Sequence, residues 1–287
     1  MDTKKFLAQE NEKVKLADFE TDYTGKIKSK KEAEELLEAN IKKMRELQSK
    51  LYASDRFALL LVFQAMDAAG KDGTIKRVMS GLNPQGTQVF SFKQPSLEEM
   101  DHGYLWRINK ALPERGRIGI FNRSHYEEVL VVRVHNYLKS SRLPENRIDK
   151  NIWSRRFEQI NGFEEYLYEN GIIPVKFFLH ISKDEQKKRF ISRIDDPSKN
   201  WKFSKADIEE RKYWDDYQKC YEEVINNTSK KHSPWYIIPS DKKWFARLLV
   251  SQIIIETLES LNLDYPKLSK EQLSELEVCK ESLLNEK

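Results

Sequence analysis

The stretch FALLLVFQAMDAAGKDGT, residues 57–74, decides the fold. The apolar run from Phe57 to Phe63 is continuous, which is typical of a strand buried on both faces of a parallel sheet. A turn of small residues follows at once, and Thr74 opens a helix that we expect to reach about Ser80. The pattern therefore predicts the central strand of an α/β fold, followed by a polar loop and a helix.

The polar loop, AMDAAGKDGT at residues 65–74, resembles a Walker A loop. In such a loop, successive backbone N–H groups and a helix N-terminus surround phosphate oxygens, while a lysine neutralises charge on the transferring group. Gly70 and Lys71 match those roles. Two positions depart from the motif: Ala65 replaces the first glycine, and Asp72 replaces the hydroxyl residue that usually helps to hold Mg²⁺.

Asp67 adds a carboxylate inside this loop, and we expect it to hold Mg²⁺ or to orient the nucleophile. The alternative is a structural turn rich in small residues. That alternative does not explain why one lysine and two aspartates follow the end of a strand. The remaining phosphate ligands expected from the loop are Ala68, Ala69, Gly70, Asp72, Gly73 and Thr74.

A second predicted strand also ends in polar residues, in the segment IGIFNRSHYEE at residues 118–128. We expect it beside the first loop, because the carboxyl ends of parallel strands meet at one edge of a sheet. Asn122 stands where an acidic Walker B residue is usual, and Arg123 is a candidate for bidentate binding of a nucleotide phosphate. Alternatively, Arg123 pairs with Glu127 or Glu128.

Strands and helices alternate along the rest of the chain, which predicts parallel pairing and one continuous domain over residues 1–287. That domain would include a helical N-terminal extension at about 1–55, a lid at about 184–226 and a helical tail at about 264–287. The other expected strands are 88–92, 118–121, 172–181 and 235–239. The other expected helices are 30–54, 97–112, 126–137, 147–168, 184–193, 207–225, 241–261 and 270–284.

The composition excludes several classes of protein. Hydrophobic residues make up 39% of the chain, enough for a core, and no apolar run approaches the roughly 20 residues of a membrane span. The N-terminus lacks a secretory signal pattern, so we expect a cytoplasmic protein. The two cysteines form no metal or disulfide motif, and a net charge of +4 does not favour nucleic acid as a partner.

Four motifs occur in order: AMDAAGKDGTIK at 65–76, NPQG at 83–86, FNRSHYEEVLVVRVH at 121–135 and PSKNWKFS at 197–204. With them the chain, from about 18 to 261, resembles the polyphosphate kinase 2 family. The resemblance implies a three-layer α/β/α P-loop kinase fold like that of thymidylate kinase, and Mg²⁺-dependent phosphoryl transfer between inorganic polyphosphate and nucleotides, with Mn²⁺ as an alternative metal. FNRS in place of FDRS looks most like class III members, which are associated with AMP and ADP as acceptors.

The lid carries the candidate donor site. Arg189 and Arg193 are four residues apart and share a helical face, and three lysines follow them, at positions Lys199, Lys202 and Lys205. Such a row suits a polyphosphate chain, which carries about one charge per phosphate. The alternative is a set of solvated ion pairs with the acidic residues that interrupt the row.

Our leading hypothesis is the reversible transfer of the terminal phosphate of polyphosphate to ADP and AMP, in line and without a phosphoenzyme. The catalytic candidates are Asp67, Lys71 and Arg123, with Asp67 as the metal ligand. The nucleotide-binding candidates are Asn122, Arg123, Glu128 and Arg133, although Arg133 could equally form a surface ion pair. We expect AMP, ADP, ATP, polyphosphate and further copies of the chain as partners, and neither nucleic acid nor membrane. The rival functions are an ATP-dependent nucleoside monophosphate kinase and a noncatalytic module that binds polyanions.

Overall fold

A computed structural model describes residues 1–286 and contains one six-stranded sheet. The strand order is β1-β6-β5-β2-β4-β3, so the predicted central strand, β2, lies inside the sheet. All neighbours pair in parallel except β1 and β6. The strands are β1 (Leu7–Ala8), β2 (Ala58–Ala65), β3 (Thr87–Ser91), β4 (Ile118–Asn122), β5 (Ile172–His180) and β6 (Trp235–Pro239).

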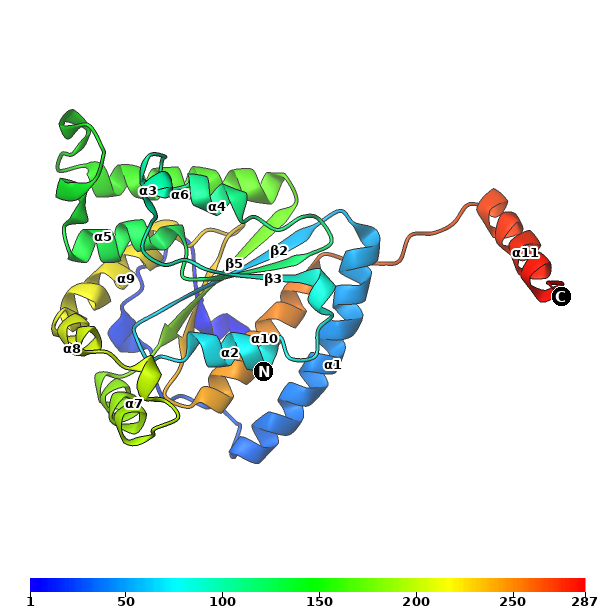
Figure 1. The fold of residues 1–287 in the computed structure, drawn as a ribbon. Coiled ribbons are helices and arrows are strands. Elements are labelled where there is room, and N and C mark those ends of the chain that lie inside the picture. The colour runs from blue at the N-terminus through cyan, green and yellow to red at the C-terminus, as the bar shows by residue number, and fades with distance from the viewer. Residues whose placement is uncertain (287) are drawn as a thin grey trace.

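Helices cover both faces of this sheet, which confirms the predicted α/β class (Figure 1). One face is covered by α1 (Lys30–Ser54), α2 (Lys71–Val78) and α10 (Lys243–Ser260), and the other by α3 (Leu97–Met100), α4 (Trp106–Lys110) and α6 (Ile152–Glu169). At one end of the sheet lie α5 (Val131–Val134), α7 (Lys183–Asp195), α8 (Lys205–Lys212) and α9 (Trp214–Thr228). The short 3₁₀ helices are η1 (Thr3–Phe6), η2 (Leu16–Asp18), η3 (Pro84–Gly86), η4 (His125–Val129), η5 (Tyr137–Ser140), η6 (Glu145–Arg147) and η7 (Asn200–Lys202).

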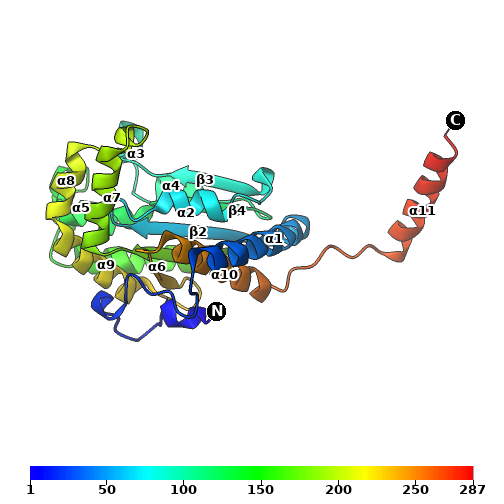
Figure 2. The ribbon, with the colours of Figure 1, turned by 90° about the horizontal axis from the view of Figure 1, so that it is seen from below.

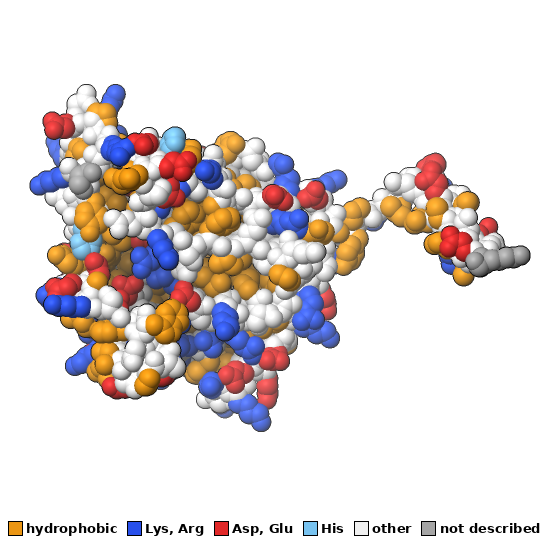
Figure 3. Space-filling view, viewed as in Figure 1, with side chains coloured by type: hydrophobic (Ala, Val, Ile, Leu, Met, Phe, Trp, Pro, Cys, Tyr) orange, Lys and Arg blue, Asp and Glu red, His pale blue; other side chains and the backbone are white. Residues whose placement is uncertain are grey.

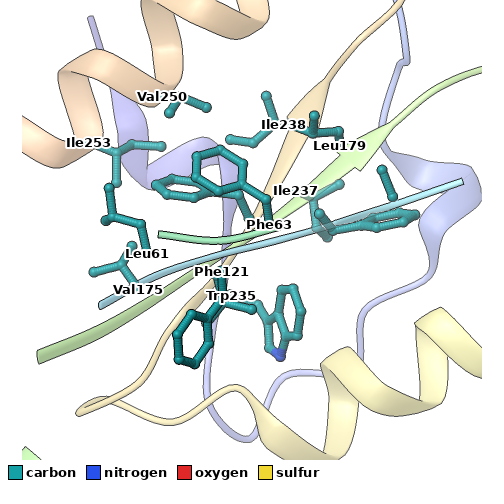
Figure 4. Packing of buried hydrophobic residues seen from close by; sticks show 14 of the residues in the cluster. Leu61, Phe63, Phe121, Val175, Leu179, Trp235, Ile237, Ile238, Val250 and Ile253 are labelled. Atoms are coloured by element: carbon teal, nitrogen blue, oxygen red, sulfur yellow. The ribbon is translucent and has the colours of Figure 1, made fainter. Parts of the chain in front are cut away.

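The core lies between the sheet and the helices on each side. Figure 4 shows Val250 and Ile253 of α10 above the strand residue Leu61, with Phe121 and Trp235 on the opposite side of the sheet. All eight residues of β2 are buried, as the apolar run predicts for a strand covered on both faces. Within residues 1–286, no helix is long and apolar enough to cross a membrane.

Several expected helices are interrupted or shortened. The helix expected at 147–168 begins only at Ile152. The helix expected at 97–112 is two short helices with Gly103 between them, and that expected at 126–137 is a 3₁₀ turn followed by the short helix α5. The helix expected at 207–225 breaks at Tyr213, because the chain turns there to bury Trp214 while α8 stays at the surface. The N-terminal extension also differs from the expected helix, since its first 29 residues form two 3₁₀ turns and the edge strand β1.

The C-terminal helix α11 (Lys270–Leu284) has the predicted bounds and projects from the body on an extended segment (Figures 1 and 2). None of its residues is buried, and leucines such as Leu273 and Leu276 are more than half exposed.

Candidate active site

The phosphate loop lies between the end of β2 and the start of α2, as predicted. Ala68 and Gly70 adopt left-handed backbone conformations, with φ of 60° and 107°, and Gly70 caps α2. A Cβ on Gly70 would find no atom within 3.7 Å, so it is the backbone conformation, and not a lack of space, that favours glycine there. The turn directs the N-terminus of α2 toward the edge of the sheet, where β4 also ends.

Lys71 is held inside this loop. Its Nζ donates a hydrogen bond to the carbonyl oxygen of Ala65 over 3.0 Å, which folds the side chain back across the loop. Burial, together with the nearby positive charge of Arg123, lowers the pKa of Lys71 to about 8, against the attraction of Asp67 and Glu127. The lysine therefore carries its charge at neutral pH in a site that disfavours a cation and would gain from a bound anion.

Arg123 lies directly opposite Asp67, with 3.1 Å between Nη2 and Oδ1. Its Nη1 is 3.9 Å from a carboxylate oxygen of Glu127. Burial alone would lower the pKa of Arg123, but the two carboxylates outweigh it and raise the pKa. Arg123 has a φ of 64°, unusual for a residue with a side chain, and its N–H bonds to the carbonyl of Phe63. The structure thus brings together the three predicted catalytic residues.

Glu127 completes this cluster and was not among the predicted site residues. Burial raises the pKa of Glu127, although the charges of Arg123 and Lys71 oppose the shift. From the sequence, we considered Glu127 only as a possible ion-pair partner of Arg123. A helical pattern would place Glu127 and Glu128 on different faces, but it does not tell which of them meets the loop.

Two predicted nucleotide-binding residues form ion pairs with neighbouring helices. Glu128 pairs with Arg156 of α6 over 3.0 Å, and Arg133 pairs with Glu223 of α9 over 2.6 Å. Each therefore has a partner on a neighbouring helix, and within residues 1–286 no hydrogen bond or ion pair joins either one to the phosphate loop. Asn122 does reach the loop, since its amide donates to Asp72 over 2.7 Å.

Arg189, which we expected to bind polyphosphate from the lid, is buried beneath the loop and does not face an open lid surface. Its guanidinium donates to the carbonyl oxygens of Ala68 and Ala69 and to those of Ser240 and Asp241, at 2.6 to 3.1 Å, while Nε pairs with Glu185. These bonds use all five donors of the side chain. Arg189 therefore ties the phosphate loop to the end of β6.

The other predicted lid cations do not form one continuous row. Arg193 donates to the carbonyl of Lys202 over 3.3 Å, and Lys202 lies over the Trp201 ring at 4.8 Å. Lys199 pairs with Asp196. Lys205 is exposed at the first position of α8.

Two cations of α10 line the phosphate loop and were missed by the sequence reasoning. The Cε of Lys243 lies 4.0 Å from the position that a Cβ on Gly70 would take, and Nη2 of Arg247 lies 3.4 Å from that of Gly73. Burial and other cations lower the pKa of both side chains, and the Nε of Arg247 is buried without a hydrogen-bond partner. In the part of the chain that the structure describes, neither forms an ion pair.

One feature of the sequence indicates that Lys243 lies near a bound anion. Lys242 and Lys243 begin a helix, where the helix dipole disfavours cations unless an anion is bound nearby. Figure 3 shows Lys and Arg side chains gathered around α2 and the neighbouring lid on this face.

The comparison with known proteins identifies the family. A family model described as Polyphosphate kinase 2 matches residues 26–266. The chain belongs to the polyphosphate kinase 2 family. It is 53% identical over 284 residues to the ADP-polyphosphate phosphotransferase of Rhodopseudomonas palustris, covering 98% of each chain. It is 44% identical over 265 residues to the AMP/ADP-polyphosphate phosphotransferase of Meiothermus ruber, covering 92% of this chain and 96% of the relative.

A crystal structure of Polyphosphate Kinase 2 from Arthrobacter aurescens has a similar fold. The TM-score is 0.86 at 42% sequence identity, with 93% of each chain covered. The polyphosphate kinase 2 fold predicted from the motifs is therefore confirmed.

A kinase of the polyphosphate kinase 2 family implies a divalent cation, and the residues of the loop fit one. Within residues 1–286, no group of three or more His, Cys, Asp or Glu could hold a metal alone. Mg²⁺ in such enzymes, however, is usually bound by one or two carboxylates together with substrate phosphates. Asp67 and Asp72 supply two carboxylates in the same loop, on either side of Lys71. The donor set is thus suited to a cation that arrives with its phosphate ligands.

Proposed function

We propose that this protein transfers phosphoryl groups from inorganic polyphosphate to ADP, and that AMP is a second acceptor. The observation that carries the proposal is the cluster of Asp67, Lys71 and Arg123 at the ends of β2 and β4, in a chain of the polyphosphate kinase 2 family. The relative from Rhodopseudomonas palustris is named for ADP, and that from Meiothermus ruber for both AMP and ADP.

Lys71 neutralises charge on the transferring phosphoryl group, and the amides from Ala68 to Thr74 hold its oxygens. The attacking group of ADP or AMP is a phosphate oxygen that already carries charge. No residue has to remove a proton from it, and catalysis rests on positioning and on charge neutralisation. Asp67 and Asp72 would hold Mg²⁺, which neutralises phosphate charge when bound.

Arg123 binds the acceptor phosphates next to the loop. Its guanidinium is held by Asp67 and Glu127, which orient it beside the loop. Asn122 presents a neutral amide at the same strand end. A neutral group there avoids repulsion of the AMP phosphate, which carries about two negative charges at neutral pH.

The donor chain lies along Lys243 and Arg247, which replace Arg189 in our account of its binding. These two cations border the loop on the side of α2 and have no ion-pair partners in the described chain. Burial and neighbouring cations lower the pKa of each side chain. A polyanion would relieve that repulsion. The lid carries four further cations, namely Arg193, Lys199, Lys202 and Lys205. It would close over the polyphosphate chain and exclude water.

A time course with purified protein tests the acceptor range. The reaction starts with AMP, polyphosphate and Mg²⁺, and the nucleotides are separated at intervals. We expect ADP to appear first and ATP to follow. Conversion of ADP but not of AMP would remove AMP as an acceptor. Phosphorylation of AMP by ATP, with no reaction of either nucleotide with polyphosphate, would favour an ATP-dependent nucleoside monophosphate kinase.

A further inference from the structure

A buried ion pair lies below the active site, between Lys176 of β5 and Glu164 of α6. Both side chains are completely buried. The Nζ of Lys176 donates to the Glu164 carboxylate, to the carbonyl of Thr228 over 2.7 Å and to the Tyr126 hydroxyl over 3.0 Å. None of these groups reaches the phosphate loop, so the reaction does not use the pair directly.

The pair is bonded to the segment that carries the active-site arginine. Glu164 accepts a hydrogen bond from the hydroxyl of Tyr126 over 2.8 Å, and its carboxylate lies 3.3 Å from Nε2 of His125. His125 and Tyr126 open η4, two and three residues after Arg123 and just before Glu127. Both ions of the pair therefore hold the same short turn.

That turn contains backbone strain. Arg123 adopts a left-handed conformation with φ of 64°, which persists only where the surrounding structure fixes it. On one side, its N–H is bonded to the carbonyl of Phe63. On the other, the buried hydroxyl of Ser124 accepts bonds from Gln64 and from the N–H of Tyr126. Further along the chain, the ion pair holds the side chain of Tyr126, because its hydroxyl is hydrogen-bonded to both Glu164 and Lys176.

A buried ion pair adds little net stability, because the attraction between the charges must first offset their desolvation. Apolar residues of similar volume would often serve a core equally well. A role in fixing geometry accounts for its place here. The geometry it fixes is the turn that places Arg123 against Asp67 and brings Glu127 to 3.9 Å from the same guanidinium.

We propose that Lys176 and Glu164 are positioning residues of the active site, which act through Tyr126 and His125 to hold Arg123 and Glu127 in their reactive orientation. The proposal rests on the role given to Arg123 above. It adds that part of the catalytic rate depends on charges buried on the α6 side of the sheet.

The test compares two hydroxyl deletions on the same network. Tyr126→Phe removes the hydroxyl that joins both ions to η4, while Lys176 keeps Glu164 and Thr228. Ser233→Ala is the matched control, since the buried Ser233 hydroxyl accepts from Lys176 over 3.3 Å but does not contact η4. We expect Tyr126→Phe to lower kcat about tenfold with little change in KM for ADP or polyphosphate. Ser233→Ala should keep kcat within about twofold of wild type.

A double-mutant cycle shows whether Tyr126 acts through Arg123. If it does, Tyr126→Phe should have little further effect on kcat in an Arg123→Lys background. Additive losses, or equal losses of kcat in Tyr126→Phe and Ser233→Ala, would overturn the proposal.

A second measurement is independent of turnover and keeps the positioning role separate from the assigned reaction. Hydrogen exchange followed by mass spectrometry should show faster exchange at residues 123–127 in Tyr126→Phe than in Ser233→Ala. Unchanged protection of that segment would overturn the positioning role, even if wild type is fully active. A wild-type protein without polyphosphate activity but with the expected exchange difference would instead overturn the proposed reaction alone.

Discussion

Lys71→Met should make the substrate-free protein more stable and at the same time almost inactive. The lysine holds its charge in a site where burial and Arg123 disfavour it, so its pKa is about 8 in the folded protein against 10.5 for an ordinary lysine. Methionine fills a similar volume without a charge to desolvate. Lys71 is thus expected to lower the free energy of unfolding of the protein while it supports the reaction.

The size of the gain follows from that pKa. A difference of about 2.5 pKa units corresponds to about 3 kcal/mol at neutral pH. The variant loses the hydrogen bond from Lys71 to the Ala65 carbonyl, which contributes about 1 kcal/mol. Lys71 is half-buried, and solvent screening reduces the electrostatic part. We therefore expect a net stabilisation of about 1 to 2 kcal/mol, or a rise in Tm of a few degrees.

The pH dependence of this stabilisation shows whether the buried charge of Lys71 causes it. Below pH 8 the lysine is charged in both the folded and the unfolded state, so the full penalty is present. Between about pH 8 and 10.5 the folded protein releases its proton first, and the stability of wild type rises with pH. The advantage of Lys71→Met should therefore shrink across that range.

Thermal unfolding at a series of pH values, without nucleotide or polyphosphate, measures this difference. Lys76→Met is the matched control, because Lys76 lies on the same helix and is exposed. Turnover of Lys71→Met should fall by about a hundredfold or more. The reasoning fails if Lys71→Met is less stable than wild type at pH 7, or if its advantage is the same at pH 7 and pH 10.

Four further outcomes are expected. The kcat/KM for polyphosphate should fall as pH rises through about 8, because the free enzyme then loses the charge on Lys71; a flat profile to pH 10 would contradict this assignment. Asp67→Asn should reduce turnover about a hundredfold and raise the Mg²⁺ concentration needed for half-maximal rate, and near-normal turnover would remove Asp67 as the metal ligand. Asn122→Asp places a second carboxylate against Asp72 and should lower kcat/KM more for AMP than for ADP, whereas equal losses would leave Asn122 without a role in selectivity. Replacing Lys243 and Arg247 with Ala should raise KM for polyphosphate and flatten its salt dependence more than Arg193→Ala does; a change in the KM of ADP alone would refute the donor path.

Local patterns predicted the elements that frame the site. The helix at 30–54 has the bounds of α1, because its apolar residues recur every three or four positions over 25 residues. The strand before the phosphate loop was equally clear, since β2 is apolar at every position except Gln64 and is followed by a turn rich in small residues. The resemblance to a Walker A loop then predicted that Asp67 and Lys71 lie between this strand and the next helix, and they do, because the loop is a single local structure.

Contacts between segments that are far apart in the chain could not be predicted from the sequence. Glu128 was expected near the nucleotide, but its partner Arg156 lies 28 residues away on α6, and only the packing of α6 brings them together. Arg189 was expected to face solvent with Arg193, yet it is turned inward by carbonyls of two strand ends. Helical spacing shows which residues lie on the same face of a helix, but it does not show which other segment packs against that face.

The measurement that tests the central claim most directly is the fate of phosphate during ATP synthesis. Purified protein is mixed with ADP, Mg²⁺ and polyphosphate, and ³¹P NMR follows chain phosphate, free orthophosphate and nucleotide together. We expect one chain phosphate to be lost for each ATP formed and almost none to appear as orthophosphate, because a phosphoryl group passes directly from donor to acceptor. Loss of chain phosphate to orthophosphate, or the absence of ATP while polyphosphate and ADP are both present, would contradict it.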